Sequence, residues 1–254
     1  MPRFLKSVLL VGAILSIQAN TADADALATE GTRGSITPYV WGTSVTGDAS
    51  VGPLSTEVDL SFSDMLEDLE FALMVEGEYW NGRWGLLGNL MHSNQQSNGG
   101  GVLATTTDIK MTMLGAAVAY RYGPFPNSAN RTLFDAYAGL RYTKMDVTLT
   151  TGGGASASRE IDFTDPVIGG RFFIELDPES RMLIGGDIGG FGVGSDLSWQ
   201  LYGFYARDVK LGRTPATVSL GYRALGQDYT TGGTVPLTID TTYHGPVVAL
   251  SFHF

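Results

Sequence analysis

Cysteine is absent from this sequence of 254 residues, and charged residues are scarce. Without cysteine the chain has no disulfide, no thiolate nucleophile and no cysteine-ligated metal site. Charged residues make up only 17% of the chain, against about 25% in typical soluble domains. The 26 acidic residues outnumber the 16 basic ones, and the net charge of -10 argues against binding nucleic acid.

Long apolar runs are also missing, except at the amino terminus. Beyond residue 30 no run approaches the roughly 20 apolar residues that a transmembrane helix needs. Two basic residues precede the apolar stretch 8–17, and small residues follow it. This pattern predicts a signal peptide over residues 1–26, cleaved near Ala24 or Ala26, with an uncleaved anchor as the alternative. We therefore expect an exported protein.

Glycine is abundant, and apolar residues recur with a period of two. The 34 glycines are about 13% of the chain, nearly twice the usual ~7%. In 134–142 the residues Phe, Ala, Ala, Leu and Tyr alternate with Asp, Tyr, Gly and Arg, and 168–177 and 217–223 show the same alternation. Period two predicts strands with one apolar and one polar face. The predicted strands, about ten, cover 35–47, 71–80, 83–95, 105–122, 132–149, 159–176, 181–191, 198–210, 215–228 and 240–254.

The connections between these strands alternate in length. Short turns are predicted at 81–83, 123–131, 177–180 and 211–215, and longer loops at 48–69, 95–105, 151–159, 192–197 and 229–240. An even strand number places both ends of residues 34–254, the single predicted domain, on the short-turn side. Eight or twelve strands are the alternatives, because residues 54–62 could pair as an additional strand. One short helical turn is expected at Asp64–Leu69.

The distribution of charge decides which face of the sheet points outward. Most mid-strand charges lie on the glycine-containing face: Glu76, Glu78, Arg121, Arg141, Arg171, Asp187 and Arg223. A soluble barrel would show such charges to water, whereas a membrane barrel turns them into its lumen and its apolar face to lipid. The low charge content favours the membrane barrel. Folding about the short turns pairs Arg121 with Asp135 and Arg171 with Asp187 as candidate ion pairs in the lumen.

A sheet in lipid has to close, because lipid cannot hydrogen-bond free backbone groups. The last strand must therefore pair with the first, near residues 36–42. Pro38 has no amide proton, so it should lie where a ladder hydrogen bond is missing. The fold class predicted is all-β, a closed antiparallel up-and-down transmembrane barrel.

The terminal strand carries a resemblance to a known class. Its alternate residues Val248, Leu250, Phe252 and Phe254 end the chain on an aromatic ring. This resembles the assembly signal of bacterial outer-membrane β-barrel proteins. The stretches 38–42, 58–64 and 81–85 resemble the uncharacterised proteobacterial barrels of the OmpA and opacity-like porin superfamily, and the resemblance covers the whole mature chain.

The resemblance implies a location in the outer membrane, reached through the signal peptide. The implied partners are outer-membrane lipid, lipopolysaccharide and the outer-membrane assembly machinery, and a monomer is expected.

Enzymatic chemistry is not expected, and no catalytic residue, metal site or cofactor is assigned. Lipid A deacylases of this class use a His-x-Ser-Asn arrangement, but here His92 and Ser93 are adjacent, which sends them to opposite faces of a strand. An omptin-type protease needs a paired acidic site, and no spacing singles one out among the loop aspartates Asp48, Asp59, Asp64, Asp196 and Asp228.

Transport is limited by size, because side chains fill small barrels. We therefore predict a structural or surface-interaction role with at most a narrow channel. The alternatives are adhesion or host-factor binding through the extracellular loops and, less favoured, a lipid A hydrolase or protease.

Overall fold

The computed structural model describes residues 27–51, 54–63, 69–99, 105–126, 130–150, 153–154, 156–212, 214–230 and 237–254. The predicted signal peptide and most of the predicted helical turn at Asp64–Leu69 lie outside them. The strands are β1 (Thr32–Trp41), β2 (Ser44–Val51), β3 (Leu54–Leu60), β4 (Leu69–Asn81), β5 (Trp84–Gly99), β6 (Thr105–Tyr122), β7 (Thr132–Thr150), β8 (Ser156–Asp177), β9 (Ser180–Gly190), β10 (Leu197–Leu211), β11 (Thr214–Thr230) and β12 (Leu237–His253). In the described part, no helix has the length and apolar character needed to cross a membrane.

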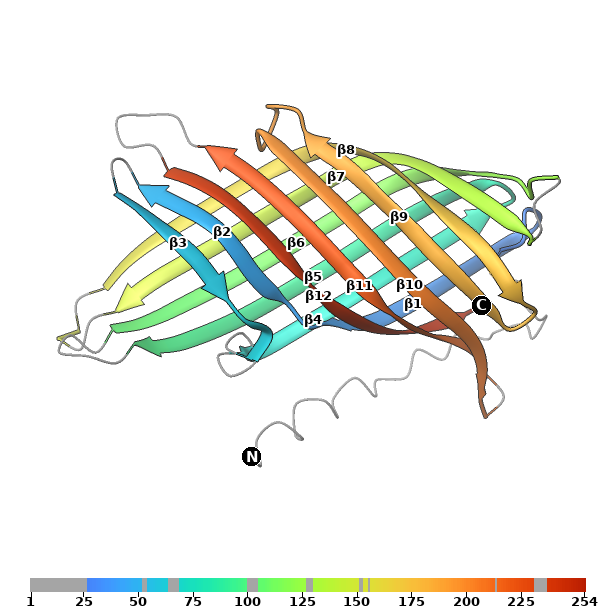
Figure 1. The fold of residues 1–254 in the computed structure, drawn as a ribbon, viewed down its shortest axis with the longest axis horizontal. Helices are drawn as coiled ribbons and strands as arrows, with labels where there is room; N and C mark the ends of the chain where they lie inside the picture. Colours follow the sequence, from blue (N-terminus) through green and yellow to red (C-terminus); the bar gives the residue numbers. More distant parts are fainter. Residues whose placement is uncertain are drawn as a thin grey trace.

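Ten of these strands form a closed antiparallel barrel (Figure 1). Strands β4 to β12 pair in sequence order, β1 pairs with β4, and β1 closes the sheet against β12. The closing ladder runs from Ser35 opposite His253 to Trp41 opposite Val247. Its pairs skip Thr37 and Pro38, where the Thr37 hydroxyl donates to the Ser251 hydroxyl at 2.8 Å. The predicted all-β barrel is confirmed.

The predicted first strand, 35–47, is wrong in one respect. The strand is interrupted at Gly42 and Thr43. β2 then pairs with β12, as β1 does, but in the described residues it does not pair with β4. The chain then folds back as β3, which pairs with β2. The long loop predicted at 48–69 therefore contains a hairpin, and the alternative of a strand within 54–62 is the one observed. The hairpin forms because β12 runs past the end of β1 and offers β2 its free ladder positions.

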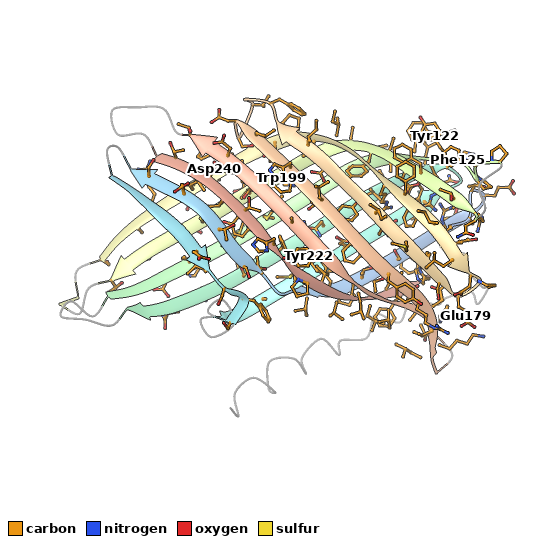
Figure 2. The ribbon with its side chains drawn as sticks, viewed as in Figure 1. Tyr122, Phe125, Glu179, Trp199, Tyr222 and Asp240 are labelled. Atoms are coloured by element: carbon orange, nitrogen blue, oxygen red, sulfur yellow. The ribbon has the colours of Figure 1, made fainter. Side chains whose placement is uncertain are left out.

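The barrel has a turn end and a loop end. The turn end carries the short connections and Phe254, and the loop end carries the longer ones (Figure 1). Apolar side chains cover the outer face, including Val40, Leu86, Leu114, Val118, Leu140, Ile168, Ile184, Leu201, Leu220 and Val248 (Figure 2). Charged side chains occupy the lumen instead, as the charge distribution predicts.

A row of aromatic rings crosses four strands near the turn end. Trp84, Tyr120, Tyr122, Phe134 and Phe172 follow one another with ring centroids 5.0, 4.8, 6.2 and 4.6 Å apart. The rings come from β5, β6, β7 and β8 and lie on the outer face. Such a row is typical of the girdle that membrane barrels place at a lipid–water interface.

At the loop end the barrel wall divides into two groups of strands (Figure 1). β8 pairs with β9 only from Val167 onward. Among the described strands, the preceding residues Ser156–Pro166 therefore pair with β7 only. The first lip is formed by the loop-end parts of β5 to β8. The second lip is formed by the loop-end parts of β11 and β12 together with β2 and β3. We call the two lips together the extension.

Candidate functional site

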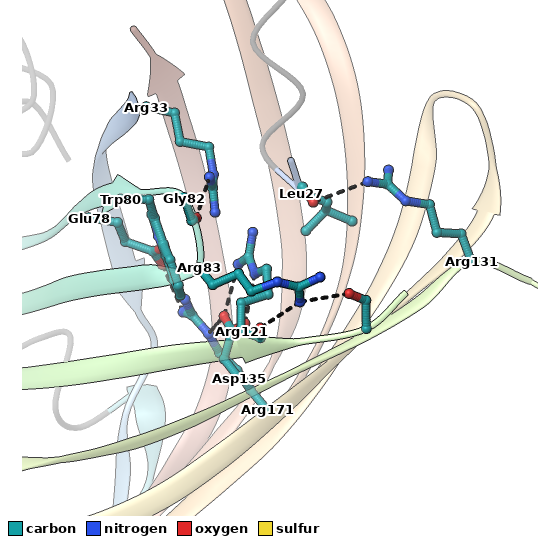
Figure 3. A network of polar contacts seen from close by, with 11 residues as sticks. Leu27, Arg33, Glu78, Trp80, Gly82, Arg83, Arg121, Arg131, Asp135 and Arg171 are labelled. Atoms are coloured by element: carbon teal, nitrogen blue, oxygen red, sulfur yellow. Dashed lines mark hydrogen bonds and ion pairs between the residues drawn. The ribbon is translucent and has the colours of Figure 1, made fainter. Parts of the chain in front are cut away.

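The lumen near the turn end is filled by a buried ion-pair network (Figure 3). Arg121 donates to both carboxylate oxygens of Asp135, from Nε at 2.7 Å and from Nη2 at 2.8 Å. Arg171 donates to the same carboxylate at 3.1 Å and, through both Nη atoms, to Glu78 at 2.7 and 2.9 Å. Asp135 and Arg121 are almost completely buried. Buried charges of this kind are tolerated only when they are paired and hydrogen-bonded.

Trp80 lies at the centre of this network. Its indole N–H donates to Glu78 at 2.8 Å. The Arg121 guanidinium lies 4.2 Å from the centroid of its ring and that of Arg33 lies 5.0 Å away, so two cations contact one buried aromatic ring. Cation–π contacts gain strength where water is excluded. Together these side chains obstruct the lumen at the turn end.

The structure brings together one of the two predicted ion pairs and not the other. Arg121 and Asp135 lie opposite each other in the β6–β7 hairpin and pair. Arg171 lies opposite Gly185, two residues from Asp187 along β9, and its guanidinium pairs with Glu78 and Asp135 instead. The predicted pair of Arg171 with Asp187 is therefore wrong.

The true partners come from across the barrel. Arg171 binds Glu78 on β4, and Asp187 accepts from Arg141 on β7 at 2.5 Å. Sequence analysis placed Glu78 and Arg141 on the polar face but did not connect them. Their shared lumen-facing parity is the only signal in the sequence, because the contacts span 93 and 46 residues.

A second polar layer lies farther from the turn end. Asp187 also accepts from the Tyr137 hydroxyl at 3.1 Å and the Gln200 amide at 3.3 Å. The Gln200 side-chain oxygen in turn accepts from Arg223, which also donates to the Tyr39 hydroxyl at 3.3 Å. The layer is therefore continuous from β7 to β1.

Toward the loop end the lumen becomes apolar. The buried cluster there contains Tyr39, Trp41, Val45, Met91, Met111, Met113, Leu225, Tyr243, Val247 and Ala249, with Met74, Met145 and Phe204 packed against it. Five of the eight methionines of the chain thus lie in one cluster. A cavity of about 250 Å³ lies in the lumen and is lined by both the polar layers and part of the apolar cluster. Arg223, Glu76, Met113 and Phe204 all face it.

The histidines do not form a catalytic arrangement. His92 lies on the outer face and its Nδ1 is 2.9 Å from the Thr112 hydroxyl, whereas Ser93 is buried on the inner face. His244 contacts the Tyr222 hydroxyl at 2.7 Å, and His253 contacts the Thr217 hydroxyl at 2.7 Å. A lipid A deacylase would need its Ser and His side chains on one face of a strand, whereas Ser93 and His92 lie on opposite faces of β5.

Three loop aspartates line up on the second lip. Asp228 lies opposite Asp240 on β12, and Asp240 lies opposite Asp48 on β2. Partial burial, with Asp240 and Asp196 nearby, raises the pKa of Asp228. Asp59 lies on β3, and Asp64 falls outside the described residues. Among the described residues, no three acidic or histidine side chains form a set that could hold a metal ion.

The predicted assembly-signal residues lie on one face of β12. Val248 is 52% exposed and Phe254 is 39% exposed on the outer face, and Leu250 and Phe252 lie between them with partial exposure. Val247 and Ala249, which lie on either side of Val248 in the sequence and face the other way, are buried in the lumen.

No protein-family model and no curated protein matches this chain. Solved structures share its fold at low sequence identity. The outer membrane protease OmpT from Escherichia coli aligns with a TM-score of 0.51 and 10% identity over 88% of this chain and 97% of that one. The attachment invasion locus protein Ail of Yersinia pestis aligns over 89% of this chain and 99% of its own, with a TM-score of 0.39 and 11% identity. Neisserial surface protein A (NspA) aligns over 89% and 100%, with a TM-score of 0.38 and 11% identity.

The likeness to OmpT concerns the fold alone, and it agrees with the closed antiparallel sheet described above. The chain is therefore a small β-barrel of the bacterial outer-membrane type.

Proposed function

We propose that this protein spans the bacterial outer membrane and acts by surface interaction, with the barrel as its anchor and the extension as its contact surface. In outer-membrane barrels the short turns face the periplasm and the longer loops face outward. The turn end, with Phe254, is then periplasmic, and the extension stands outside the cell.

The observation that carries the proposal is the change in the outer face along β6, β7 and β8. Leu114, Leu140 and Ile168 are each about half exposed and suit contact with lipid. Immediately toward the loop end the outer-facing positions become charged: Lys110, Lys144, Asp146, Glu160 and Asp162. Lys144 pairs with Glu160 at 2.8 Å. A paired sheet with a charged outer face is suited to water and to polar partners.

The side chains in the lumen favour a role for the barrel as a membrane anchor over a role as an open pore. The ion-pair network obstructs its turn end, and the apolar cluster crosses it toward the loop end. The lumen cavity has about 250 Å³, too little for a path that would pass nutrients. The proposed barrel therefore conducts ions weakly or not at all.

Adhesion to host cells or matrix is the form of surface interaction to test first. Bacteria displaying the protein would be compared with bacteria carrying the double variant Lys110→Glu and Lys144→Glu, which changes the outer face of the first lip. The matched control is Arg207→Glu, an exposed reversal at the turn end. We expect binding of wild-type and control cells and reduced binding of the double variant, with equal barrel amounts on unboiled gels.

Two results would count against the proposal. If wild-type cells bound no better than cells lacking the protein, the proposed role in surface adhesion would be wrong. A large, steady conductance of the purified protein in planar bilayers would show an open pore rather than a sealed anchor.

A further inference from the structure

Two side chains that contact each other in the lumen each have a buried hydrogen-bond donor without a partner. The indole nitrogen of Trp41 and the Nε of Arg223 are both shielded from water and make no hydrogen bond within the described part of the protein. The Arg223 guanidinium lies 4.6 Å from the centroid of the Trp41 ring. The two side chains are 4% and 8% exposed. A buried donor without an acceptor costs free energy, so two such donors in neighbouring side chains indicate a site for a hydrogen-bond acceptor.

Arg223 also differs in its partners from three other arginines of the lumen. Arg121, Arg141 and Arg171 each pair with a carboxylate. The hydrogen bonds of Arg223 go to two neutral groups, Gln200 and Tyr39, and no carboxylate of the described residues forms an ion pair with it. Glu76 acts on it electrostatically from farther away and accepts a hydrogen bond from Asn89 instead. The site thus has a cation with an unfilled position for an anionic oxygen.

The surroundings of these donors are apolar. Trp41 belongs to the methionine-rich cluster, and Arg223, Met113, Val247 and Phe204 all line the lumen cavity. Methionine side chains are unbranched and adapt their shape to a ligand, so they can open space beside Trp41. An occupant that suits both features has an apolar chain and one carboxylate.

A break in the barrel wall lies beside this cluster. The β1–β4 ladder ends at Pro38 opposite Val75, whereas β4 continues to Leu69 with β5 as its partner among the described strands. β3 pairs with β2 alone in the described sheet. Met74 of the apolar cluster lies immediately past the last β1–β4 pair. Within the described residues, β4 beyond Val75 therefore has an edge without a partner strand, beside the apolar part of the lumen.

Apolar side chains flank this break on the outer face. Val40 is 69% exposed on β1 and Leu73 is 38% exposed on β4. The Phe62 ring covers Gly42 so closely that a β-carbon there would lie 2.9 Å from it. Gly42 is the residue at which the chain leaves β1 for β2. The Phe62 ring thus covers the junction between the outer face and Trp41.

We propose that the lumen binds a small apolar monocarboxylate of the fatty-acid class, with its carboxylate on Arg223 Nε and Trp41 Nε1 and its chain among the methionines. The ligand enters from the lipid phase beside Val40 and Leu73, where the β1–β4 ladder ends at the base of the extension. The entry route rests on the proposed membrane location, whereas the binding site itself does not.

Binding can be measured with carboxyl-¹³C-labelled octanoate and the folded protein in lipid nanodiscs, by following the carboxyl resonance. We expect a shifted resonance that saturates at one equivalent of protein and that empty nanodiscs do not show. Arg223→Gln should weaken binding about tenfold or more, because a charge-assisted hydrogen bond is lost. Trp41→Phe keeps an aromatic ring but loses the pyrrole part of the indole with its N–H, and it leaves Arg223 in place, so it should weaken binding by a smaller factor, about threefold to tenfold.

The controls separate this site from less specific binding. Arg207→Gln removes an exposed arginine at the turn end and should leave the affinity for octanoate unchanged. Glu76→Gln removes the carboxylate that already acts on Arg223 and should raise that affinity. Acetate, which lacks a chain, and octanol, which lacks a carboxylate, should both compete poorly.

Several results would overturn the proposal. These are the absence of a saturable resonance, equal binding by the folded Arg223→Gln variant, and equal competition by acetate, which would indicate an anion site only. Folding of every variant is checked by the gel shift between unboiled and boiled samples. The adhesion and conductance assays do not involve octanoate, so this inference and the proposed surface function can fail independently.

Discussion

Phe254, the last residue, exchanges two backbone hydrogen bonds with Gly34, near the start of β1, and its ring packs over that glycine. The Gly34 N–H donates to the Phe254 carbonyl at 2.8 Å, and the Phe254 N–H donates to the Gly34 carbonyl at 3.0 Å. A β-carbon on Gly34 would lie 2.5 Å from the Phe254 ring, so the ring lies directly over the glycine. The terminal aromatic thus completes the seam at which the barrel closes.

Replacing Phe254 with Asp should impair assembly of the barrel. The substitution removes the ring from Gly34 and puts a negative charge on an apolar outer face. We expect a large fall in the heat-modifiable form of the protein in outer-membrane fractions. Phe254→Tyr keeps the ring and should assemble normally. Equal amounts of folded Asp and Tyr variants would show that the seam does not depend on this ring.

Removing Arg171 should destabilise the folded barrel by about 3–5 kcal/mol, because Asp135 and Glu78 would each lose a partner in a buried site. The measurement is equilibrium unfolding of Arg171→Gln in urea. The comparison is Arg131→Gln, whose pair with Glu175 is about one-third exposed and should contribute no more than about 1 kcal/mol.

A double variant isolates the interaction itself. Adding Glu78→Gln to Arg171→Gln should recover part of the lost stability, because the unpaired carboxylate disappears. Strictly additive losses from the two substitutions would contradict a coupled network.

The two predicted ion pairs show how far sequence reasoning extends. Arg121 and Asp135 lie opposite each other in one hairpin, so the position of a turn is enough to predict their contact. The predicted pair of Arg171 with Asp187 fails because Arg171 lies opposite Gly185, two residues from Asp187, and its side chain reaches across the lumen to Glu78. The exact register of a hairpin depends on local backbone geometry, and contacts across a barrel depend on its closure, so neither follows from alternation alone.

The same distinction holds for the rest of the molecule. Alternation and charge placement were sufficient for the closed barrel and for the inward arginines, because strand period fixes the face of every residue. The β2–β3 hairpin was expected only in part, as the alternative strand within 54–62, since Gly52 and Pro53 interrupt the strand pattern of this stretch. The unpartnered donors of Trp41 and Arg223 depend on neighbours from several strands, and no sequence signal marks them.

His92→Ala should leave lipid A unchanged. His92 is bonded to Thr112 on the outer face, and Ser93 is buried on the other side of the strand, so no serine–histidine hydrogen bond can form between them. Mass spectrometry of lipid A from strains expressing the wild-type and variant proteins should give matching patterns. Deacylated lipid A that appears with the wild type and disappears with the variant would establish hydrolase activity.

Asp228 should make the loop end of β11 and β12 more stable in mild acid than at neutral pH. Its pKa is raised above the ordinary value of 3.8, by burial first and then by Asp240 and Asp196. A raised carboxyl pKa means that the folded state binds the proton more tightly than the unfolded state. Stability is therefore gained as the pH falls through the raised pKa toward 3.8, and lost as the pH rises again.

Hydrogen-exchange protection factors for β11 and β12, corrected for intrinsic exchange rates, measure this effect. Asp228→Asn should remove the pH dependence and increase protection at pH 7. Asp177 provides a control of opposite sign, because the Glu179 backbone N–H, at 2.8 Å, lowers its pKa. Its stabilising contribution is present above the ordinary pKa and is lost as the pH falls through the lowered value. Protection that rises with pH around Asp228 would show that the aspartate row is not a repulsive one.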